Sequence, residues 1–536
     1  MCGIYFYASK DELNYKEISD RFYRIKYRGP DQSVTENFLW NDLNIFLGFH
    51  RLAIIDINNG KQPFFSEGIY LICNGEIFNH HELVKKYDLK LKTHSDCEVI
   101  LHLYRKFGES FVNMLDGDFA FILFDSKKGE LHFARDMIGV RPLFMDRNLK
   151  YVELASELKA LKSDRAVEVS PGYYYKYNFY TGSLHSKVYK SIISTTKKEI
   201  QVIMPELRKI FTESVKKRLE SERDIGFLLS GGLDSSLVLS VACELLPEKQ
   251  FHAFSIGSQD DISPDIENAK TVVNYLNYKY NLKMKGKPKV IHHIVHFDYQ
   301  KAIENIEELV YTIETFDITT IRASTPMWWL CKYIRDNTDI KVLFSGEGSD
   351  ELFGGYLYFY YAPNGRELEK ETEKLVNELH MYDVCRADRS VSSNGLELRV
   401  PFLDKEFVKY VLNIDGEIRR PIKDFKMEKW ILRKSFEGFL PESILYLQKA
   451  AFSDNAGYGW KDAIKKYCEH KLKSKDVGKL INKSFSDNPE EIHHRYIFQK
   501  YFGSHIGIIS HLWLPNKEWV DTGSEPSARV LEVYKK

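Results

Sequence analysis

Short apolar runs broken by turn signals fill the chain up to about residue 185. Runs at 69–73, 118–124 and 131–134 predict β-strands, and the turn between the last two predicts a hairpin. Short connections favour antiparallel pairing. Residues 82–86 and 95–107 have helical spacing instead, and Ser95 with Glu98 forms a capping-box pattern at the start of the second helix. We therefore expect antiparallel sheets with flanking helices over residues 2–190.

The pattern changes after a polar, Lys- and Thr-rich stretch at 191–205, which we interpret as a linker. Strands are expected at 224–229, 251–256, 290–295 and 340–344, with a helix at 235–246. Strands that alternate with helices predict a parallel sheet covered on both faces, with ligands at the carboxyl ends of the strands. Helices are also expected at 366–380 and 405–440. This α/β domain should span residues 206–520, followed by a tail at 521–536.

Composition narrows the class of protein. The chain has 536 residues with 76 Lys plus Arg against 76 Asp plus Glu, so no overall field favours nucleic acid or an anionic membrane. Seven scattered cysteines without a CxxC pair indicate reduced thiols and a cytoplasmic setting, not a disulfide framework or a zinc site. We find no signal-peptide pattern and no apolar run long enough to span a membrane.

The sharpest motif is Ser230-Gly231-Gly232-Leu233-Asp234-Ser235-Ser236, which follows a predicted strand and opens a helix. Glycines let the backbone turn tightly and point N–H groups at an anion, and the helix N-terminus adds partial positive charge. The lysine and spacing of a Walker A motif are missing. We expect a phosphate-binding loop in which Asp234 holds Mg²⁺. The alternative, a plain strand-to-helix turn, would not need this combination of residues.

A second strand-end loop reads Ser345-Gly346-Glu347-Gly348-Ser349-Asp350-Glu351. Asp350 is a candidate second metal ligand, and Glu347 a candidate acid, base or orienting group; a solvated acidic turn is the alternative. Arg399 and Lys449 stand beside apolar residues, which suggests partial burial. The guanidinium of Arg399 could bind both oxygens of a substrate carboxylate, and the ammonium of Lys449 could stabilise negative charge on a transferring phosphate. Each residue could equally be an ordinary surface charge.

Cys2 would carry both a thiol and a free α-amine once Met1 is removed. The two groups have pKa values of roughly 8.5 and 7.7, so the amine can act as the base that activates the thiol. Asn74 and Gly75 are candidate oxyanion donors, although Asn-Gly is also the commonest hairpin turn.

Three charged residues of the same half match a free amino acid as ligand. Arg51 could hold an α-carboxylate, and Glu76 and Asp96 an α-ammonium.

Taken together, these motifs resemble the glutamine-hydrolysing asparagine synthetases. The likeness covers roughly residues 1–460 with the order of motifs preserved. The matching segments are Cys2-Gly3-Ile4, Arg28-Gly29-Pro30-Asp31, His50-Arg51-Leu52, Asn74-Gly75-Glu76-Ile77, 230–236, 319–327, 345–351, 399–404, Gln448-Lys449 and Phe452-Ser453-Asp454.

For the first half, the resemblance implies an Ntn-type αββα sandwich that hydrolyses glutamine with Cys2 as nucleophile. The glutamine-binding residues that it implies are Arg51, Leu52, Ile54, Asn74, Gly75, Glu76 and Asp96.

For the second half, the resemblance implies an ATP-pyrophosphatase (HUP-like) fold. There aspartate would be adenylated to β-aspartyl-AMP and aminated by ammonia that arrives through an internal tunnel. The implied ATP-binding residues are Leu229, Ser230, Gly231, Gly232, Asp234, Ser235, Ile256, Ser345 and Gly346. Glu347 and Lys449 would be catalytic, Arg322 and Arg399 would bind aspartate, and Asp234 and Asp350 would hold Mg²⁺. The expected partners are glutamine, aspartate, ATP and a second copy of the chain, with neither nucleic acid nor membrane.

The chain departs from the family pattern at Tyr27, where His is usual, at Leu447, where Arg is common, and at Ala450 and Ala451. The segment 257–265 is slightly longer than expected. Two alternatives stay open: a β-lactam-forming synthetase, whose relatives typically lose the cysteine, and a non-catalytic homologue. Retention of Cys2 with the synthetase motifs favours neither.

Overall fold

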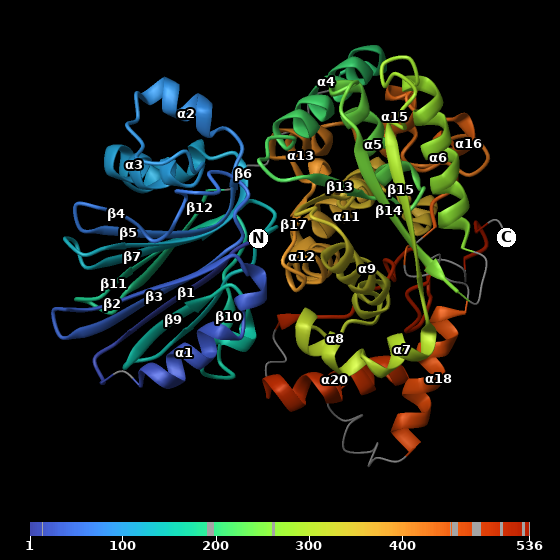
Figure 1. The fold of residues 1–536 in the computed structure, drawn as a ribbon. Helices are drawn as coiled ribbons and strands as arrows, with labels where there is room; N and C mark the ends of the chain where they lie inside the picture. Colours follow the sequence, from blue (N-terminus) through green and yellow to red (C-terminus); the bar gives the residue numbers. More distant parts are fainter. Residues whose placement is uncertain are drawn as a thin grey trace.

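The computed structural model describes residues 1–12, 14–189, 198–259, 263–450, 452, 459–473, 484–503, 508–527 and 531–534. Two domains lie side by side, with strands β1–β12 on the left of Figure 1 and the parallel sheet on the right. The first part of the predicted linker, 191–197, lies outside the described residues. Its last part is helical, because α4 (Ile200–Lys217) begins there and buries Ile203 and Leu207 in the core.

The N-terminal domain contains two six-stranded antiparallel sheets. The first has the order β10-β8-β9-β1-β3-β2 and the second β12-β11-β7-β6-β5-β4. The strands are β1 (Gly3–Ser9), β2 (Gln32–Trp40), β3 (Leu43–Arg51), β4 (Phe64–Ser66), β5 (Ile69–Ile77), β6 (Gly117–Asp125), β7 (Glu130–Arg135), β8 (Phe144–Arg147), β9 (Tyr151–Ala155), β10 (Val167–Glu168), β11 (Tyr173–Asn178) and β12 (Leu184–Val188).

Alternating residues of these strands build the layers. Phe6 of β1 and Phe124 of β6 meet between the sheets, whereas Tyr5 packs outward against Phe22 of α1 (Tyr15–Tyr23). Helices α2 (His80–Tyr87) and α3 (Glu98–Phe107) cover the outer face of the second sheet (Figure 1). The predicted antiparallel sandwich with flanking helices is confirmed.

Two local predictions in this domain are wrong. The pair Asn74-Gly75 does not end its strand, because β5 continues to Ile77 and pairs Gly75 with Phe119 of β6. The capping box at α3 does not form either. The Glu98 carboxylate instead accepts from the backbone N–H groups of Lys92 and Thr93, both at 2.8 Å.

The C-terminal domain is built on a five-stranded parallel sheet of order β15-β14-β13-β16-β17. Its strands are β13 (Ile225–Leu228), β14 (Phe251–Ser258), β15 (Val290–Phe297), β16 (Val342–Phe344) and β17 (Glu397–Arg399). The first four match the predicted strands, and the three-residue strand β17 was not predicted. Helices α5 (Leu233–Leu245) and α6 (Pro264–Tyr280) cover one face of the sheet, and α9 (Ile318–Asn337) and α12 (Asp383–Ser392) cover the other.

The rest of this domain is helical. Its helices include α7 (Tyr299–Glu304), α8 (Ile306–Ile313), α10 (Ser349–Phe353), α11 (Gly365–Glu378), α13 (Lys405–Leu412), α14 (Gly416–Arg419), α15 (Trp430–Ser435), α16 (Glu442–Leu445), α18 (Trp460–Lys473) and α20 (Pro489–Phe502). The helix predicted over 405–440 is thus three short ones. Within the described ranges, no helix has the length and apolar character needed to cross a membrane.

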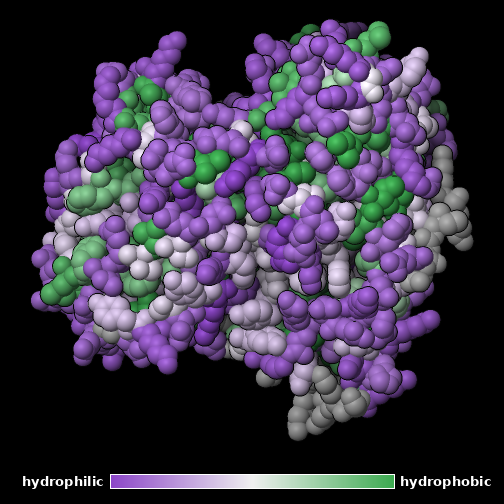
Figure 2. Space-filling model, in the orientation of Figure 1, coloured by the Kyte–Doolittle hydropathy of each residue, from purple (hydrophilic) through white to green (hydrophobic). Residues whose placement is uncertain are grey.

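The view of Figure 2 shows a mostly hydrophilic face with small hydrophobic patches, and a notch between the two domains at the top. Below that notch the domains are in contact. One candidate site described next lies at this seam, and the other lies within the C-terminal domain.

Candidate active sites

Cys2 lies immediately before β1, at the seam between the domains. Its backbone N–H donates to Asn74 Oδ1 at 2.8 Å, and Arg28 Nε donates to its carbonyl oxygen at 3.0 Å. The backbone N–H of Leu52 points at the thiol, with N to Sγ at 3.5 Å. Burial raises the pKa of the Cys2 thiol to about 11. A buried thiol of this kind needs a base to become nucleophilic.

Asn74 supports the predicted oxyanion role. Because its Oδ1 accepts from Cys2, its Nδ2 points elsewhere, and this buried donor has no hydrogen-bond partner. Gly75 follows with φ of 155°, and a Cβ there would overlap the carbonyl oxygen of Asp118. Strand β5 therefore brings an unpartnered side-chain donor, Asn74 Nδ2, and the backbone of a residue without a side chain, Gly75, next to the nucleophile. An oxyanion site requires donors of this kind.

Acidic groups crowd the same region. Burial raises the pKa of Glu76 well above its usual range, and the nearby carboxylates of Glu397 and Asp96 raise it further. Burial also raises the pKa of Asp96, which accepts from the N–H of Ile77 at 2.6 Å. A bound ammonium group would relieve this repulsion, so the pair fits the predicted amino-acid ligand.

The other predicted glutamine-binding residues have structural partners. The guanidinium of Arg51 donates to the carbonyl oxygens of Ile57 at 2.9 Å and Asp56 at 2.5 Å, so it holds the loop beside the site. Leu52 and Ile54 are buried. Their contact with a ligand stays a prediction, as does removal of Met1, whose amino group lies 3.8 Å from Glu397.

The C-terminal domain has a pocket where strands β13, β14 and β16 end. Eleven predicted site residues line it: Leu229, Ser230, Asp234, Ser235, Ile256, Arg322, Ser345, Gly346, Glu347, Asp350 and Lys449. Gly232 lines an adjoining cavity together with Ser230 and Lys449. Gly231 has φ of 76° and lies so close to α6 that a Cβ would overlap the backbone of Ala269. The two loops therefore converge as predicted.

Two lysines hold the carboxylates of this pocket. The ammonium of Lys429 lies 2.6 Å from Asp234 Oδ2 and 2.7 Å from Asp350 Oδ1, and Lys449 lies 2.7 Å from Asp350 Oδ2. Burial alone would raise the pKa of Asp350, but the two lysines lower it to about 2. Asp350 is therefore ionised at neutral pH.

Lys429 was missed by the sequence analysis. It is buried, its backbone is left-handed with φ of 57°, and a Cβ on Gly355 would overlap its side chain. Such strain is kept where the surroundings require it and is frequent at functional sites. Nothing in the sequence marks this residue, because its position depends on a turn that brings it back to the pocket.

The carboxylates fit a magnesium ion. Asp234 Oδ1 is buried and has no hydrogen-bond partner, and Asp350 lies across from it on the second loop. Carboxylate oxygens are the ligands that Mg²⁺ prefers. The Lys429 ammonium now lies between the two groups, so a shared ion would have to displace it.

The two arginines predicted to bind aspartate are both engaged elsewhere. Arg399 lies on β17 at the seam, donates to the carbonyl oxygens of Arg218 and Glu220, and pairs with Glu397 at 2.9 Å. It does not line the pocket. Arg322 does, but its guanidinium is taken by Glu490 and Glu525.

Arg386 of α12 is the better candidate. It lines the pocket, pairs with Glu347 at 2.5 Å and Asp383 at 2.7 Å, and its Nε is buried without a partner. An arginine among carboxylates is the inventory that a zwitterionic amino acid needs.

Comparisons with known proteins agree with this geometry. A glutamine amidotransferase domain family matches residues 1–205, and the asparagine synthase family matches residues 206–375 and 362–510. A probable glutamine-hydrolysing asparagine synthetase of Acanthamoeba polyphaga mimivirus is 38% identical over 99% of this chain and 100% of its own length. The corresponding enzymes of Zea mays and Rattus norvegicus are each 38% identical over 100% of this chain, and over 94% and 99% of their own lengths.

The chain belongs to the glutamine-hydrolysing asparagine synthetases. The structure shows what surrounds three of the residues that depart from that family's pattern, Tyr27, Leu447 and Ala450. The Tyr27 hydroxyl bonds the Glu157 carboxylate and accepts from Lys159 at 2.8 Å, inside the seam. Leu447 and Ala450 line the cavity beside Lys449. Ala451, Ser453, Asp454 and residues 260–262 lie outside the described residues.

Proposed function

We propose that this asparagine synthetase makes L-asparagine from L-aspartate, ATP and the side-chain nitrogen of L-glutamine. The single observation that carries the proposal is that one chain pairs Cys2 with an unpartnered Asn74 donor and also has a pocket lined by both synthetase loops. A β-lactam-forming synthetase or a binding protein would need only part of this inventory.

In the first half-reaction, the thiolate of Cys2 attacks the side-chain amide carbon of glutamine. The proton that the Cys2 thiol gives up before this attack goes to the α-amine that removal of Met1 exposes, and then to the leaving nitrogen, which departs as ammonia. Asn74 Nδ2 and the Gly75 backbone hold the oxyanion, while Glu76 and Asp96 hold the α-ammonium. Water then cleaves the thioester and yields glutamate.

In the second half-reaction, a side-chain carboxylate oxygen of aspartate attacks the α-phosphorus of ATP, and pyrophosphate leaves. We assign the pyrophosphate to the Ser230 loop with Lys429 and Lys449, and the aspartate to Arg386 with Glu347. Asp234 and Asp350 would hold Mg²⁺, which neutralises phosphate charge when bound. Ammonia then attacks the activated carbonyl carbon and AMP departs.

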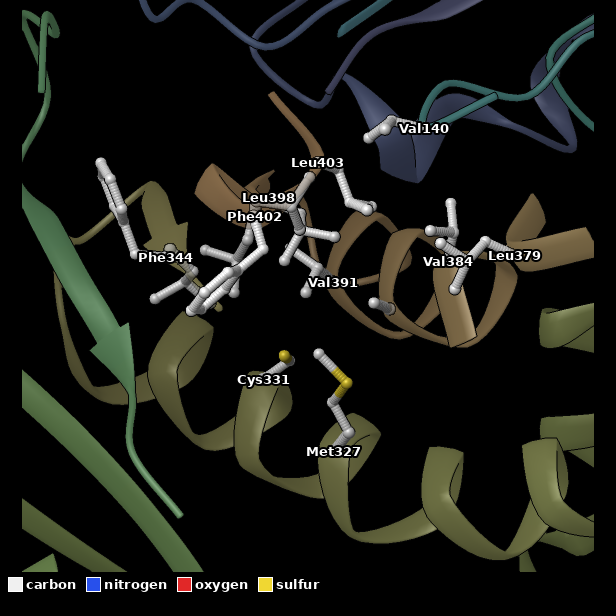
Figure 3. Close-up of a cluster of buried hydrophobic side chains, with 14 of the residues drawn as sticks. Val140, Met327, Cys331, Phe344, Leu379, Val384, Val391, Leu398, Phe402 and Leu403 are labelled. Atoms are coloured by element: carbon white, nitrogen blue, oxygen red, sulfur yellow. The ribbon is translucent and has the colours of Figure 1, made fainter. Parts of the chain in front are cut away.

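We also propose that ammonia travels through the apolar core. One cluster of buried apolar residues includes Leu52 beside Cys2 and Met327 in the synthetase pocket. Figure 3 labels part of it: Val140 of the first domain lies near Leu403 of the second, and Val391 and Met327 lie further along the same cluster. An apolar route keeps ammonia unprotonated and therefore nucleophilic. A homodimer and a cytoplasmic location stay predictions.

Replacement of Cys2 by alanine tests the proposal. Glutamate, pyrophosphate and asparagine are measured in the same reaction, with glutamine or ammonium as nitrogen source. Cys2→Ala should lose at least a thousandfold of glutamine-dependent synthesis and keep ammonium-dependent synthesis. Cys385→Ala, which removes another partly exposed thiol, should keep both. Equal loss of both activities in Cys2→Ala, or pyrophosphate release that needs an acid other than aspartate, would contradict the proposed function.

A further inference from the structure

Two histidines and a glutamate meet where the domains touch, beside the glutamine-binding region and outside the synthetase pocket. His80 and His81 begin helix α2 of the first domain, and Glu220 follows α4 of the second. Their ligand atoms, one from each residue, all lie within 4.8 Å of one another. We propose that these three residues bind a divalent transition metal ion of the Zn²⁺ class, which bridges the two domains.

His80 is oriented as a ligand. Its Nδ1 donates to the carbonyl oxygen of Ile77 at 2.9 Å, which fixes the tautomer and leaves Nε2 with its lone pair. That Nε2 lies 3.9 Å from Glu220 Oε1. A backbone bond of this kind on the far nitrogen is the usual arrangement around a metal-binding histidine. His80 is also buried, so its ring cannot easily turn away.

His81 and Glu220 complete the set. His81 Nε2 lies 2.9 Å from Glu220 Oε1, and the two imidazole rings lie 3.9 Å apart between centroids. Ligand atoms of a tetrahedral Zn²⁺ ion lie about 3.3 Å from one another, given bonds of about 2.0–2.1 Å. The separations of 2.9 and 3.9 Å bracket that value, and all three ligand atoms lie within 4.8 Å of one another, so rotations of the exposed His81 and Glu220 side chains would complete the site.

The donor set selects the class of ion. Two imidazoles and one carboxylate suit Zn²⁺, Ni²⁺ or Cu²⁺, whereas Mg²⁺ prefers oxygen ligands only. A simple ion pair is the alternative explanation for the contact between His81 and Glu220. Exposed ion pairs add little to the stability of the fold, and an ion pair between these two residues does not account for the orientation of His80.

The ion would bridge the two domains, because His80 and His81 belong to the first domain and Glu220 to the second. The carbonyl oxygen of Glu220 accepts from Arg399, which also faces Glu76 at 3.6 Å. The site thus lies on a segment that already connects the synthetase domain to the glutamine pocket. An ion held by both domains would stabilise their contact, because it binds only when they are docked.

The test is calorimetric titration of Zn²⁺ into chelator-treated full-length enzyme in excess Mg²⁺. We expect one saturable site whose Kd rises at least tenfold in His81→Ala and in Glu220→Gln. His185→Ala, which removes an exposed histidine of β12, should leave the Kd unchanged. Because His81 is 75% and Glu220 44% exposed, both variants should fold.

A second readout separates a bridge from mere binding. Zn²⁺ should raise the Tm of the wild-type enzyme by several degrees and should not change that of Glu220→Gln. Saturable binding that survives in both variants would assign the ion to another place, such as the Cys2 thiol, and would overturn the proposal. Absence of saturable binding by the wild type would overturn it as well.

Discussion

Single atoms without partners mark both active sites. Asn74 Nδ2 beside Cys2 and Asp234 Oδ1 in the synthetase pocket are buried polar atoms that bond nothing in the protein. Each unsatisfied group of this kind costs about 1–3 kcal/mol. We propose that ligands supply the missing partners at these two atoms, an oxyanion at Asn74 Nδ2 and a cation at Asp234 Oδ1.

Replacement of Asn74 by aspartate tests the oxyanion donor. The variant keeps an oxygen facing the Cys2 N–H but replaces the Nδ2 donor with a second acceptor. We expect glutaminase kcat to fall about 10²–10³-fold, as for loss of one oxyanion donor, while ammonium-dependent synthesis is unchanged. Steady-state kinetics of glutamate release would measure this. Glutaminase activity within tenfold of wild type would show that Nδ2 does not touch the oxyanion.

Lys429 should be required for adenylation. Lys429→Met removes the ammonium that lies between Asp234 and Asp350, so we expect pyrophosphate release to fall by about 10² or more with either nitrogen source. Glutaminase activity should persist. Gly355→Ala keeps the lysine but crowds both its side chain and the Asp350 carboxylate, and should give a smaller loss. Normal pyrophosphate release by a folded Lys429→Met enzyme would remove Lys429 from the site.

Residue types and motif spacing predicted which loops form the sites, but not every charged side chain that the sites contain. Arg399 and Arg322 look alike in the sequence, yet both are occupied by buried carboxylates and carbonyl oxygens. Arg386 and Lys429 reach the pocket through tertiary contacts that no local pattern encodes. Pairing of buried charges is a property of the folded chain.

At the scale of elements, the parallel sheet was the easier half to predict. Its strands are continuous apolar runs because both faces are covered, and each is followed by a helical pattern. Strand β5 was harder. Asn74-Gly75 looks like a turn, but the close packing of β6 against Gly75 turns the same residues into strand interior. Short elements such as β17 carry too few residues for any periodicity.

Glu98 gives helix α3 a pH-dependent anchor. Its burial raises the carboxyl pKa, but bonds from His102, Thr93 and the Lys92 backbone lower it to about 2, against an ordinary value of 4.5. A pKa that is lower in the folded state stabilises the fold above about pH 4.5, and that stability is lost as the pH falls towards 2. Glu98→Gln should therefore lower Tm by a few degrees at pH 7.

The difference between Glu98→Gln and wild type should shrink steadily between pH 4.5 and pH 2. Scanning calorimetry, or circular dichroism at a series of pH values in that interval, would measure it. A Tm difference that stays constant over the interval would show that the Glu98 carboxylate does not anchor the helix.

At the scale of the whole molecule, the domains are joined by buried ion pairs as well as apolar contacts. Arg28 donates to Cys2 and Glu157 in its own domain and to Asp388 of α12 at 2.9 Å. Glu314 of the second domain accepts from the backbone N–H groups of Leu158 at 3.0 Å and Lys159 at 2.8 Å. Removal of one partner from such a buried pair typically costs 3–5 kcal/mol. Arg28 therefore ties the backbone of the nucleophile to the synthetase domain.

This connection predicts that Asp388 couples the two half-reactions. Burial alone would raise the pKa of Asp388, but Arg28 and Arg389 lower it, so the group is charged in the folded enzyme. Asp388→Asn keeps its shape and removes that charge, which loosens Arg28 from α12. We expect several-fold more glutamate per asparagine formed, because ammonia escapes at the loosened seam, with ammonium-dependent synthesis retained.

Two matched variants make this prediction decisive. Asp88→Asn neutralises an exposed aspartate at the end of α2 and should leave the glutamate-to-asparagine ratio unchanged. Ser392→Ala removes only the 3.0 Å contact from Arg28 and should raise the ratio slightly, without the folding risk of a lost buried charge. If Asp388→Asn lowers Tm but the ratio stays at the wild-type value, the ion pairs hold the domains together without controlling the passage of ammonia. A raised ratio at unchanged glutaminase kcat would place that control at the seam itself.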